Sequence, residues 1–188
     1  MVVSDETLAT KILNGDTGAF EELLTRYDRM VYKVAYRMMG QKEEAEDIAQ
    51  EVFVTVYRKI GLFDPTQKFS AWLYRITVNT CISRLRSRSK PDLTPFDETF
   101  IPDRIPGNRN GYDPLVVLEQ KELRQQIWQA MLNLSENYRA MLILRYQMGL
   151  SNQEIAETLG IKKDNVEVGM HRARKALRQQ LAVNYWNR

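Results

Sequence analysis

The sequence is short of the residues from which disulfides, metal sites and membrane spans are built. Its 188 residues include one cysteine, Cys81, and one histidine, His171. One cysteine excludes an internal disulfide and is typical of a reducing compartment, and a lone cysteine with a lone histidine cannot make a zinc site. No apolar run reaches the length of a membrane span or a signal peptide. We therefore expect a cytoplasmic protein with no metal and no other cofactor.

The motifs of common enzyme classes are missing as well. The chain has no Gly-rich phosphate loop, no metal-binding cluster, and no serine or cysteine arranged with a histidine for nucleophilic catalysis. These absences predict that the protein has no catalytic residues, is not an enzyme and has no small-molecule substrate.

Glycine and proline are few and clustered, and strand-like alternation is absent, so we expect an all-α fold. Four of the six prolines lie in residues 91–113, where five acidic residues outnumber two basic ones. Residues 1–90 carry a net charge of +2 and residues 114–188 a net charge of +4. This distribution predicts two small helical domains, 1–90 and 114–188, joined by an extended acidic linker at 91–113.

Residues 151–177 predict two short helices joined by a tight turn. Ser151 and Glu154 form a capping-box start, and Gly160 supplies the left-handed residue that ends a helix. An ordinary pair of packed helices also has apolar residues at helical spacing and a terminating glycine. However, no acidic residue follows Gly169, and a face that carries only basic residues repels itself unless it meets phosphates. We therefore predict a helix-turn-helix that reads duplex DNA in the major groove. Its candidate DNA-binding residues are Lys162, Lys163, Asn165, Glu167, His171, Arg172, Arg174 and Lys175.

A second basic surface is predicted on the helical segment that covers residues 69–90. From Arg75 to Lys90 there are five basic residues and no acidic one. Trp72 and Tyr74 lie beside this basic edge, and single-strand binders use aromatic rings beside cations to stack bases while phosphates are neutralised. The alternative is that both aromatic side chains belong to the core.

The helix predicted at residues 42–60 carries a mixed stripe on its outer face. At helical spacing, one side of this helix presents Asp47, Gln50, Glu51, Val54 and Arg58. Such a stripe is usually a solvated surface, but the apolar Val54 in its middle favours a docking surface for another protein.

Four successive motifs resemble RNA polymerase sigma factors of the sigma-70 family, and specifically the extracytoplasmic-function (ECF) class. They are AEDIAQEVFVTVYRKI at 45–60, KFSAWLYRITVNTCISRLR at 68–86, LSENYRAMLILRYQMGLSNQEIAETLGI at 134–161 and HRARKALR at 171–178. The resemblance covers nearly the whole chain with compatible spacing. It implies a factor that binds core RNA polymerase, directs it to specific promoters and assists promoter opening. Sigma region two would form the first domain and region four the second.

The resemblance also implies a role for each surface. The 42–60 stripe would dock on the clamp helices of the polymerase β′ subunit, with the β subunit as a further partner, and the linker would thread into the RNA exit path. The segment 68–88 would recognise and melt the minus-ten promoter element, and the helix-turn-helix would read the minus-thirty-five element. The minus-ten set implied in this way is Lys68, Ser70, Trp72, Tyr74, Arg75, Asn79 and Arg86. The eight helix-turn-helix residues named above form the minus-thirty-five set.

One string departs from the family pattern. Where members typically carry Thr-Val-Lys-Ser-Arg, this chain has Asn165, Val166, Glu167, Val168 and Gly169. A carboxylate repels phosphate but can accept from a cytosine amino group, and a mid-helix glycine costs about 1 kcal/mol relative to alanine. The DNA sequence of the minus-thirty-five element that this chain would recognise should therefore not be inferred from related proteins.

Two further expectations concern partners and function. Members of the class are commonly restrained by an anti-sigma factor, so promoter DNA, core polymerase and such a factor are the expected partners. The alternative function is a helix-turn-helix transcriptional regulator that acts without being a polymerase subunit, which would leave the 42–60 stripe and the second basic helix unexplained.

Overall fold

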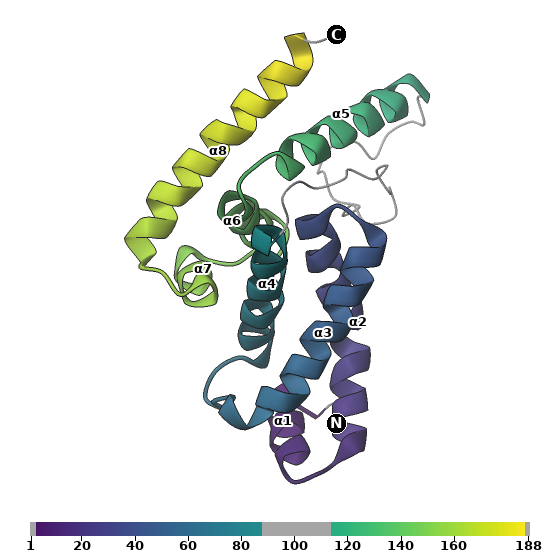
Figure 1. Ribbon diagram of the computed structural model, residues 1–188, viewed down its shortest axis with the longest axis vertical. Coiled ribbons are helices and arrows are strands. Elements are labelled where there is room, and N and C mark those ends of the chain that lie inside the picture. The colour runs from purple at the N-terminus through teal and green to yellow at the C-terminus, as the bar shows by residue number, and fades with distance from the viewer. Residues whose placement is uncertain (1–2, 88–113, 187–188) are drawn as a thin grey trace.

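The computed structural model describes residues 3–87 and 114–186, with side chains for 3–87 and 121–182 (Figure 1). The predicted linker at 91–113 and the last residues of the predicted first domain, 88–90, lie outside the described residues. Within the described ranges every regular element is a helix, which confirms the all-α prediction. The elements are α1 (Asp5–Leu13), α2 (Thr17–Met39), α3 (Lys42–Lys59), the short 3₁₀ helix η1 (Ile60–Leu62), α4 (Phe69–Ser87), α5 (Pro114–Leu132), α6 (Glu136–Tyr146), α7 (Asn152–Leu159) and α8 (Lys163–Trp186).

Helix ends in the first half are fixed by short polar side chains and glycine. The Ser4 side chain accepts a hydrogen bond from the Thr7 amide and Asp16 accepts one from the Ala19 amide, so each begins a helix. Gly40 ends α2 in the left-handed conformation, with a φ of 81°. Helices α2, α3 and α4 then pack their apolar faces together (Figure 1).

The predicted helix-turn-helix is present in α7 and α8. The Ser151 side chain accepts from the Glu154 amide at 3.2 Å, and the Glu154 carboxylate accepts from the Ser151 amide at 2.9 Å, which confirms the capping box. Gly160 ends α7 with a φ of 67°. Val166 and Met170 on α8 are buried, four positions apart on one face of the helix. The domain boundaries themselves stay a prediction.

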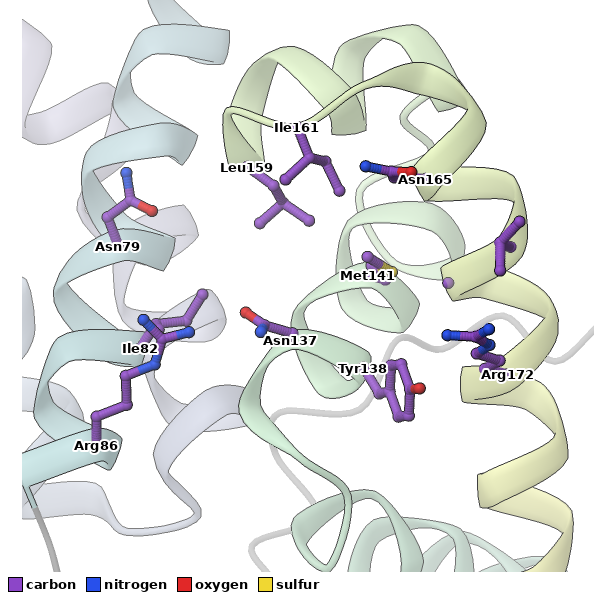
Figure 2. Close-up of a pocket in the computed structure, with 12 residues that line it drawn as sticks. Asn79, Ile82, Arg86, Asn137, Tyr138, Met141, Leu159, Ile161, Asn165 and Arg172 are labelled. Carbon is purple, nitrogen blue, oxygen red and sulfur yellow. The ribbon is translucent and has the colours of Figure 1, made fainter.

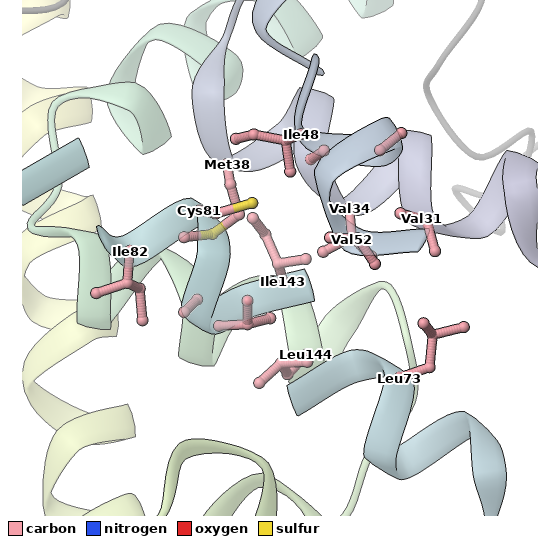
Figure 3. Close-up of a cluster of buried hydrophobic side chains, with 14 of the residues drawn as sticks. Val31, Val34, Met38, Ile48, Val52, Leu73, Cys81, Ile82, Ile143 and Leu144 are labelled. Carbon is pink, nitrogen blue, oxygen red and sulfur yellow. The ribbon is translucent and has the colours of Figure 1, made fainter. Parts of the chain in front are cut away.

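The buried core continues from the first group of helices into the second. Ile143 and Leu144 of α6 lie in the same cluster as Met38 of α2 and Cys81 of α4 (Figure 3). Cys81 is fully buried, and burial raises the pKa of its thiol to about 12. The cysteine therefore acts as a small buried side chain in the core.

Neither metal binding nor membrane insertion finds support in the described part of the chain. No group of three or more His, Cys, Asp or Glu side chains there is placed to hold a metal ion. Within the same residues, no helix combines the length and apolar character that crossing a bilayer requires.

A single buried guanidinium joins the ends of two helices. Arg139 is 4% exposed, and its nitrogens donate to the carbonyl oxygens of Met131 at 3.1 Å and Leu134 at 3.2 Å. It also donates to the carbonyls of Leu132, the last residue of α5, and Met38, near the end of α2. Helix C-termini leave such carbonyls without intrahelical partners. Burial lowers the pKa of Arg139 to about 10, so the side chain remains charged at neutral pH.

Replacing Arg139 by alanine is expected to lower the free energy of unfolding by about 2–4 kcal/mol, because several buried carbonyls lose their donor at once. The quantity is measured by urea unfolding followed by circular dichroism at 222 nm. The matched control is Arg145→Ala on the same helix, because Arg145 is exposed and donates to one carbonyl, that of Leu150. Equal losses in the two variants would show that the buried network is not important for stability.

Candidate nucleic-acid interface

The basic edge of α4 is exposed as predicted. Lys68, Arg75, Asn79 and Arg86 are exposed, whereas Ser70, Trp72 and Tyr74 are partly buried. The Trp72 ring lies 5.4 Å from the ring centre of Phe63 and 5.8 Å from that of Phe69. Trp72 is thus one wall of an aromatic cluster that still reaches the surface, so the two alternatives for this residue are compatible.

Two acidic side chains fix the start of α4. The Asp64 carboxylate accepts from the Thr66 amide at 2.9 Å and from the Thr66 hydroxyl at 2.7 Å, and these bonds lower the pKa of Asp64. Glu6 of α1 accepts from the Phe69 amide at 3.3 Å, which places a carboxylate at the positive end of the α4 dipole. The Glu6 contact joins residues 63 positions apart and has no signal in the local sequence pattern.

The eight residues of the minus-thirty-five set are all exposed on or just before α8, but they do not share one face. Asn165 and Arg172 line a cleft that faces α4, whereas His171, Arg174 and Lys175 gather with Arg178 around a separate basic depression. The two groups lie on different faces of α8, because a helix places residues three or four positions apart on the same face.

Val168 is a candidate contact residue that the sequence reading missed. It is 51% exposed, although it is apolar, and it lines the cleft beside Arg172. Its exposure could have been predicted from its position in the sequence, because a residue two positions after the buried Val166 lies outside the buried stripe of a helix.

The cleft brings the minus-ten and minus-thirty-five residues together. It has a volume of about 570 Å³. Figure 2 shows Asn79, Ile82 and Arg86 of α4 on one wall, with residues of α6 and α8 opposite them. A second cleft places Lys68 and Arg75 across from Lys162 and Lys163 at the start of α8.

Ion pairs cross between the same two groups of helices. Arg86 Nε donates to Glu136 Oε1 at 2.9 Å, and this bond lowers the pKa of the Glu136 carboxyl group. Lys68 Nζ lies 3.8 Å from Glu154 Oε1. Both carboxylates lie in the first turn of a helix, α6 or α7, where negative charge is favoured.

The α3 stripe lies at an apolar groove between α2 and α3. Asp47, Gln50, Glu51, Val54 and Arg58 are all exposed. Val54 is 49% exposed and lines the groove with Gln50, Arg58 and several aromatic side chains. Asp47 and Glu51 belong to the stripe but do not line the groove, and the Glu51 carboxylate accepts from Arg84 of α4 at 2.8 Å. The remaining residues of the groove are Phe20, Leu24, Asp28, Tyr32, Glu46, Ala49, Phe53 and Tyr57.

The atypical Gly169 has a packing reason. A Cβ atom at this position would lie 2.6 Å from the sulfur of Met141 and 2.7 Å from its terminal methyl group. The glycine therefore lets α8 approach α6 closely, and the methionine fills the space that a side chain would take. This contact offsets the loss of helix stability that a glycine in the middle of a helix causes.

Both halves of the chain match known families. Residues 23–90 match the family described as Sigma-70 region 2, and residues 124–177 match Sigma-70, region 4. The chain is 37% identical to the ECF RNA polymerase sigma factor SigW of Bacillus subtilis, over 91% of this chain and 93% of that protein. It is 33% identical to SigE of Mycolicibacterium smegmatis, over 95% of this chain and 70% of that protein.

Two solved structures share the fold. CnrH, in complex with the cytosolic domain of CnrY, has a TM-score of 0.67 at 24% identity, covering 95% of this chain and 97% of that chain. RpoE of Bartonella quintana, in complex with the anti-sigma factor NepR, has a TM-score of 0.63 at 20% identity, covering 87% of this chain and 97% of that chain. At this identity the likeness concerns the arrangement of helices.

The contact between Gly169 and Met141 can be tested with a double-mutant cycle. In a Met141→Ala background, Gly169→Ala is expected to raise the free energy of unfolding by about 1 kcal/mol, which is the difference in helix propensity. In the natural background the gain should be smaller or become a loss, because the new methyl group must displace the methionine. Urea unfolding measures both steps, and an equal effect in the two backgrounds would contradict the packing explanation.

Proposed function

This chain belongs to the ECF class of the sigma-70 family of RNA polymerase sigma factors, and on that premise we propose which of its surfaces binds the polymerase and which bind the promoter. As a sigma factor it acts in transcription initiation. In our proposal it works in the cytoplasm and performs no chemistry itself, because the core polymerase makes the RNA. Its contribution is to bind the enzyme, to select the promoter and to help open it.

The observation that carries the proposal is the separation of the surfaces. The apolar groove is lined by α2 and α3 alone, whereas the clefts with the minus-ten and minus-thirty-five residues are lined by α4, α6, α7 and α8 and the segments that adjoin them. Among the residues that the structure describes, none lines both the groove and one of these two clefts. One chain can therefore hold a protein partner and DNA at the same time, as a promoter-specificity subunit must.

We assign the groove to the β′ clamp helices of core polymerase. Exposed apolar side chains such as Val54 and Tyr57 lose water when a partner helix covers them. Gln50 and Arg58 line the groove beside them and supply a polar rim, and Asp47 lies on the same helix outside the lining of the groove. Glu51 takes a lesser part, because it is already paired with Arg84.

We assign α4 to the minus-ten element and α8 to the minus-thirty-five element. A flipped base costs a few kcal/mol of lost stacking, which the reachable Trp72 ring and the cations of Arg75 and Arg86 offset. At the start of α8, Glu167 is exposed and can accept from a cytosine amino group in the major groove. Arg172 and Arg174 contribute to DNA affinity by binding phosphates of the DNA backbone.

An anti-sigma factor is a further partner in this proposal. Both solved structures that share the fold are complexes, one with the anti-sigma factor NepR and one with the cytosolic domain of CnrY. A restraining protein that covers the apolar groove would compete directly with core polymerase for Val54 and its neighbours.

The deciding experiment is run-off transcription with purified bacterial core polymerase and a library of fragmented bacterial DNA, with and without this protein. We expect new start sites that share two spaced promoter elements. Absence of transcripts, together with failure of the protein to co-elute with core polymerase, would refute the proposal and favour a regulator that acts alone.

Val54→Arg is expected to weaken co-elution with core polymerase at least about tenfold, because a charge enters an apolar contact that must be desolvated. Leu13→Arg is the matched control, because Leu13 is 48% exposed and lies on α1 outside the groove. The helical circular dichroism spectrum should be unchanged in both variants. If the two substitutions weaken binding equally, the groove is not the docking surface.

Replacing Arg172 and Arg174 by alanine is expected to weaken holoenzyme binding to the promoters found by run-off and to flatten its salt dependence. Each phosphate contact that is lost should reduce the slope of log K against log salt by about 0.9. Arg29→Ala, which removes an exposed charge on α2, serves as the control. A slope that stays at the value of the control would rule out phosphate contacts for these two arginines.

A further inference from the structure

The first helix, α1, precedes the segment that matches Sigma-70 region 2, which begins at residue 23. Given the proposed assignment of α4 to the minus-ten element, on which this inference rests, we propose that α1 positions the start of α4 for capture of the opened DNA strand. Glu6 is the positioning residue. It acts through the first turn of α4, where Lys68 and Trp72 lie, rather than by touching DNA.

The start of α4 depends on an acceptor from outside the helix. The residue before the helix is Lys68, whose side chain has donors but no acceptor and therefore cannot cap it. The half-buried Glu6 carboxylate accepts from the Phe69 amide at 3.3 Å instead. The Trp72 amide donates to the Lys68 carbonyl oxygen at 3.3 Å, so Trp72 belongs to the same turn. Because uncapped helix ends fray, losing the Glu6 contact releases this turn.

Glu6 is held in place through its neighbour Asp5. The Asp5 carboxylate accepts from Arg26 Nη1 at 2.6 Å and from the Tyr27 hydroxyl, and both partners belong to α2. Burial and the adjacent carboxylate raise the pKa of Tyr27, so its hydroxyl is protonated and donates at neutral pH. Two consecutive acidic residues therefore join α1 to α2 on one side and to α4 on the other.

Aromatic packing extends this connection to the surface. The Tyr27 ring centre lies 5.5 Å from that of Phe69. The Phe69 ring centre in turn lies 5.5 Å from that of Phe63 and 5.8 Å from that of Trp72. Phe63 and Phe69 are buried, whereas residues 64–68 between them are all exposed. The exposed loop is thus fixed between two buried rings, beside the Trp72 ring that reaches the surface.

Helix α1 also reaches the other end of this loop. It contacts η1, which ends just before residue 63, as well as α4, which begins at residue 69 (Figure 1). One helix of nine residues therefore holds both ends of the exposed segment. A preorganised site loses less conformational entropy on binding, so capture of a flipped base need not order the loop at the same time.

The test compares the Glu6 carboxylate with a carboxylate that caps another helix. Glu6→Ala deletes the acceptor of the Phe69 amide, whereas Glu6→Gln retains an acceptor oxygen on a side chain of the same length. The matched control is Asp16→Ala, because Asp16 accepts from the Ala19 amide at 3.1 Å at the start of α2 and the substitution removes the same charge. Urea unfolding of the three variants measures the loss of stability that removal of any cap causes.

The first measurement is hydrogen exchange of the full chain, resolved by peptide. In Glu6→Ala, the amides of residues 69–72 should exchange at least about threefold faster than in the unmodified protein, because one hydrogen bond that fixes this turn is gone. Exchange of the same amides should be unchanged in Asp16→Ala and in Glu6→Gln.

The second measurement uses holoenzyme assembled with core polymerase, on the promoters found by run-off. Permanganate oxidation of unpaired thymines reports the fraction of open complex. We expect this fraction to be about threefold to tenfold lower in Glu6→Ala than in Asp16→Ala, the change that loss of one hydrogen bond produces, with unchanged co-elution with core polymerase. Glu6→Gln should restore the open fraction to within about twofold of the unmodified protein, because its acceptor remains.

Three results would overturn the inference: equal open fractions in Glu6→Ala and Asp16→Ala, unchanged exchange at residues 69–72 in Glu6→Ala, or failure of Glu6→Gln to restore opening. Promoter opening by the unmodified holoenzyme in the same experiment would leave the proposed function standing in each case. If the unmodified holoenzyme opened no promoter, the proposed function would fail, and the role of Glu6 with it.

Discussion

The relative placement of the helices depends on a buried cation that is neutralised by backbone dipoles. Burying a charge costs several kcal/mol unless it is fully paired, and Arg139 is paired with carbonyl oxygens at the C-terminal ends of α5 and α2. These ends carry partial negative charge. Because α5 and α2 come from different halves of the chain, one guanidinium fixes α6 against both, and α7 and α8 follow from α6.

The function of the molecule rests on the independence of its surfaces. The groove lies on the outer side of α2 and α3, and the clefts are lined by α4, α6, α7 and α8; in our proposal the first surface binds the polymerase, whereas α4 and α8 bind the promoter. The shared core beneath them joins Val34 and Ile48 to Ile143 (Figure 3). The buried side chains beneath the groove are therefore continuous with those beneath the helices to which we assign the promoter.

Local features were predictable from the sequence, whereas contacts between distant segments were not. The Ser151–Glu154 capping box and the end of α7 at Gly160 follow from residues within one turn of each other. The segments to which the family motifs assign surfaces are helices in the structure, whereas the role of each surface and the individual site residues stay predictions. The pairing of Arg86 with Glu136 joins residues 50 positions apart, and the fit of Gly169 against Met141 depends on side-chain shape. Helical periodicity contains no information on either.

The fit of Gly169 against Met141 also limits how this protein can diverge. Because α8 lies against α6 at this glycine, a larger residue there must displace the end of the Met141 side chain, so the effect of regaining the usual arginine depends on how well Met141 can move. Neighbouring positions 167 and 168 point outward and carry no such restriction. Substitutions at positions 167 and 168 are therefore independent of the core, whereas the effect of a substitution at position 169 is coupled to the side chain at position 141.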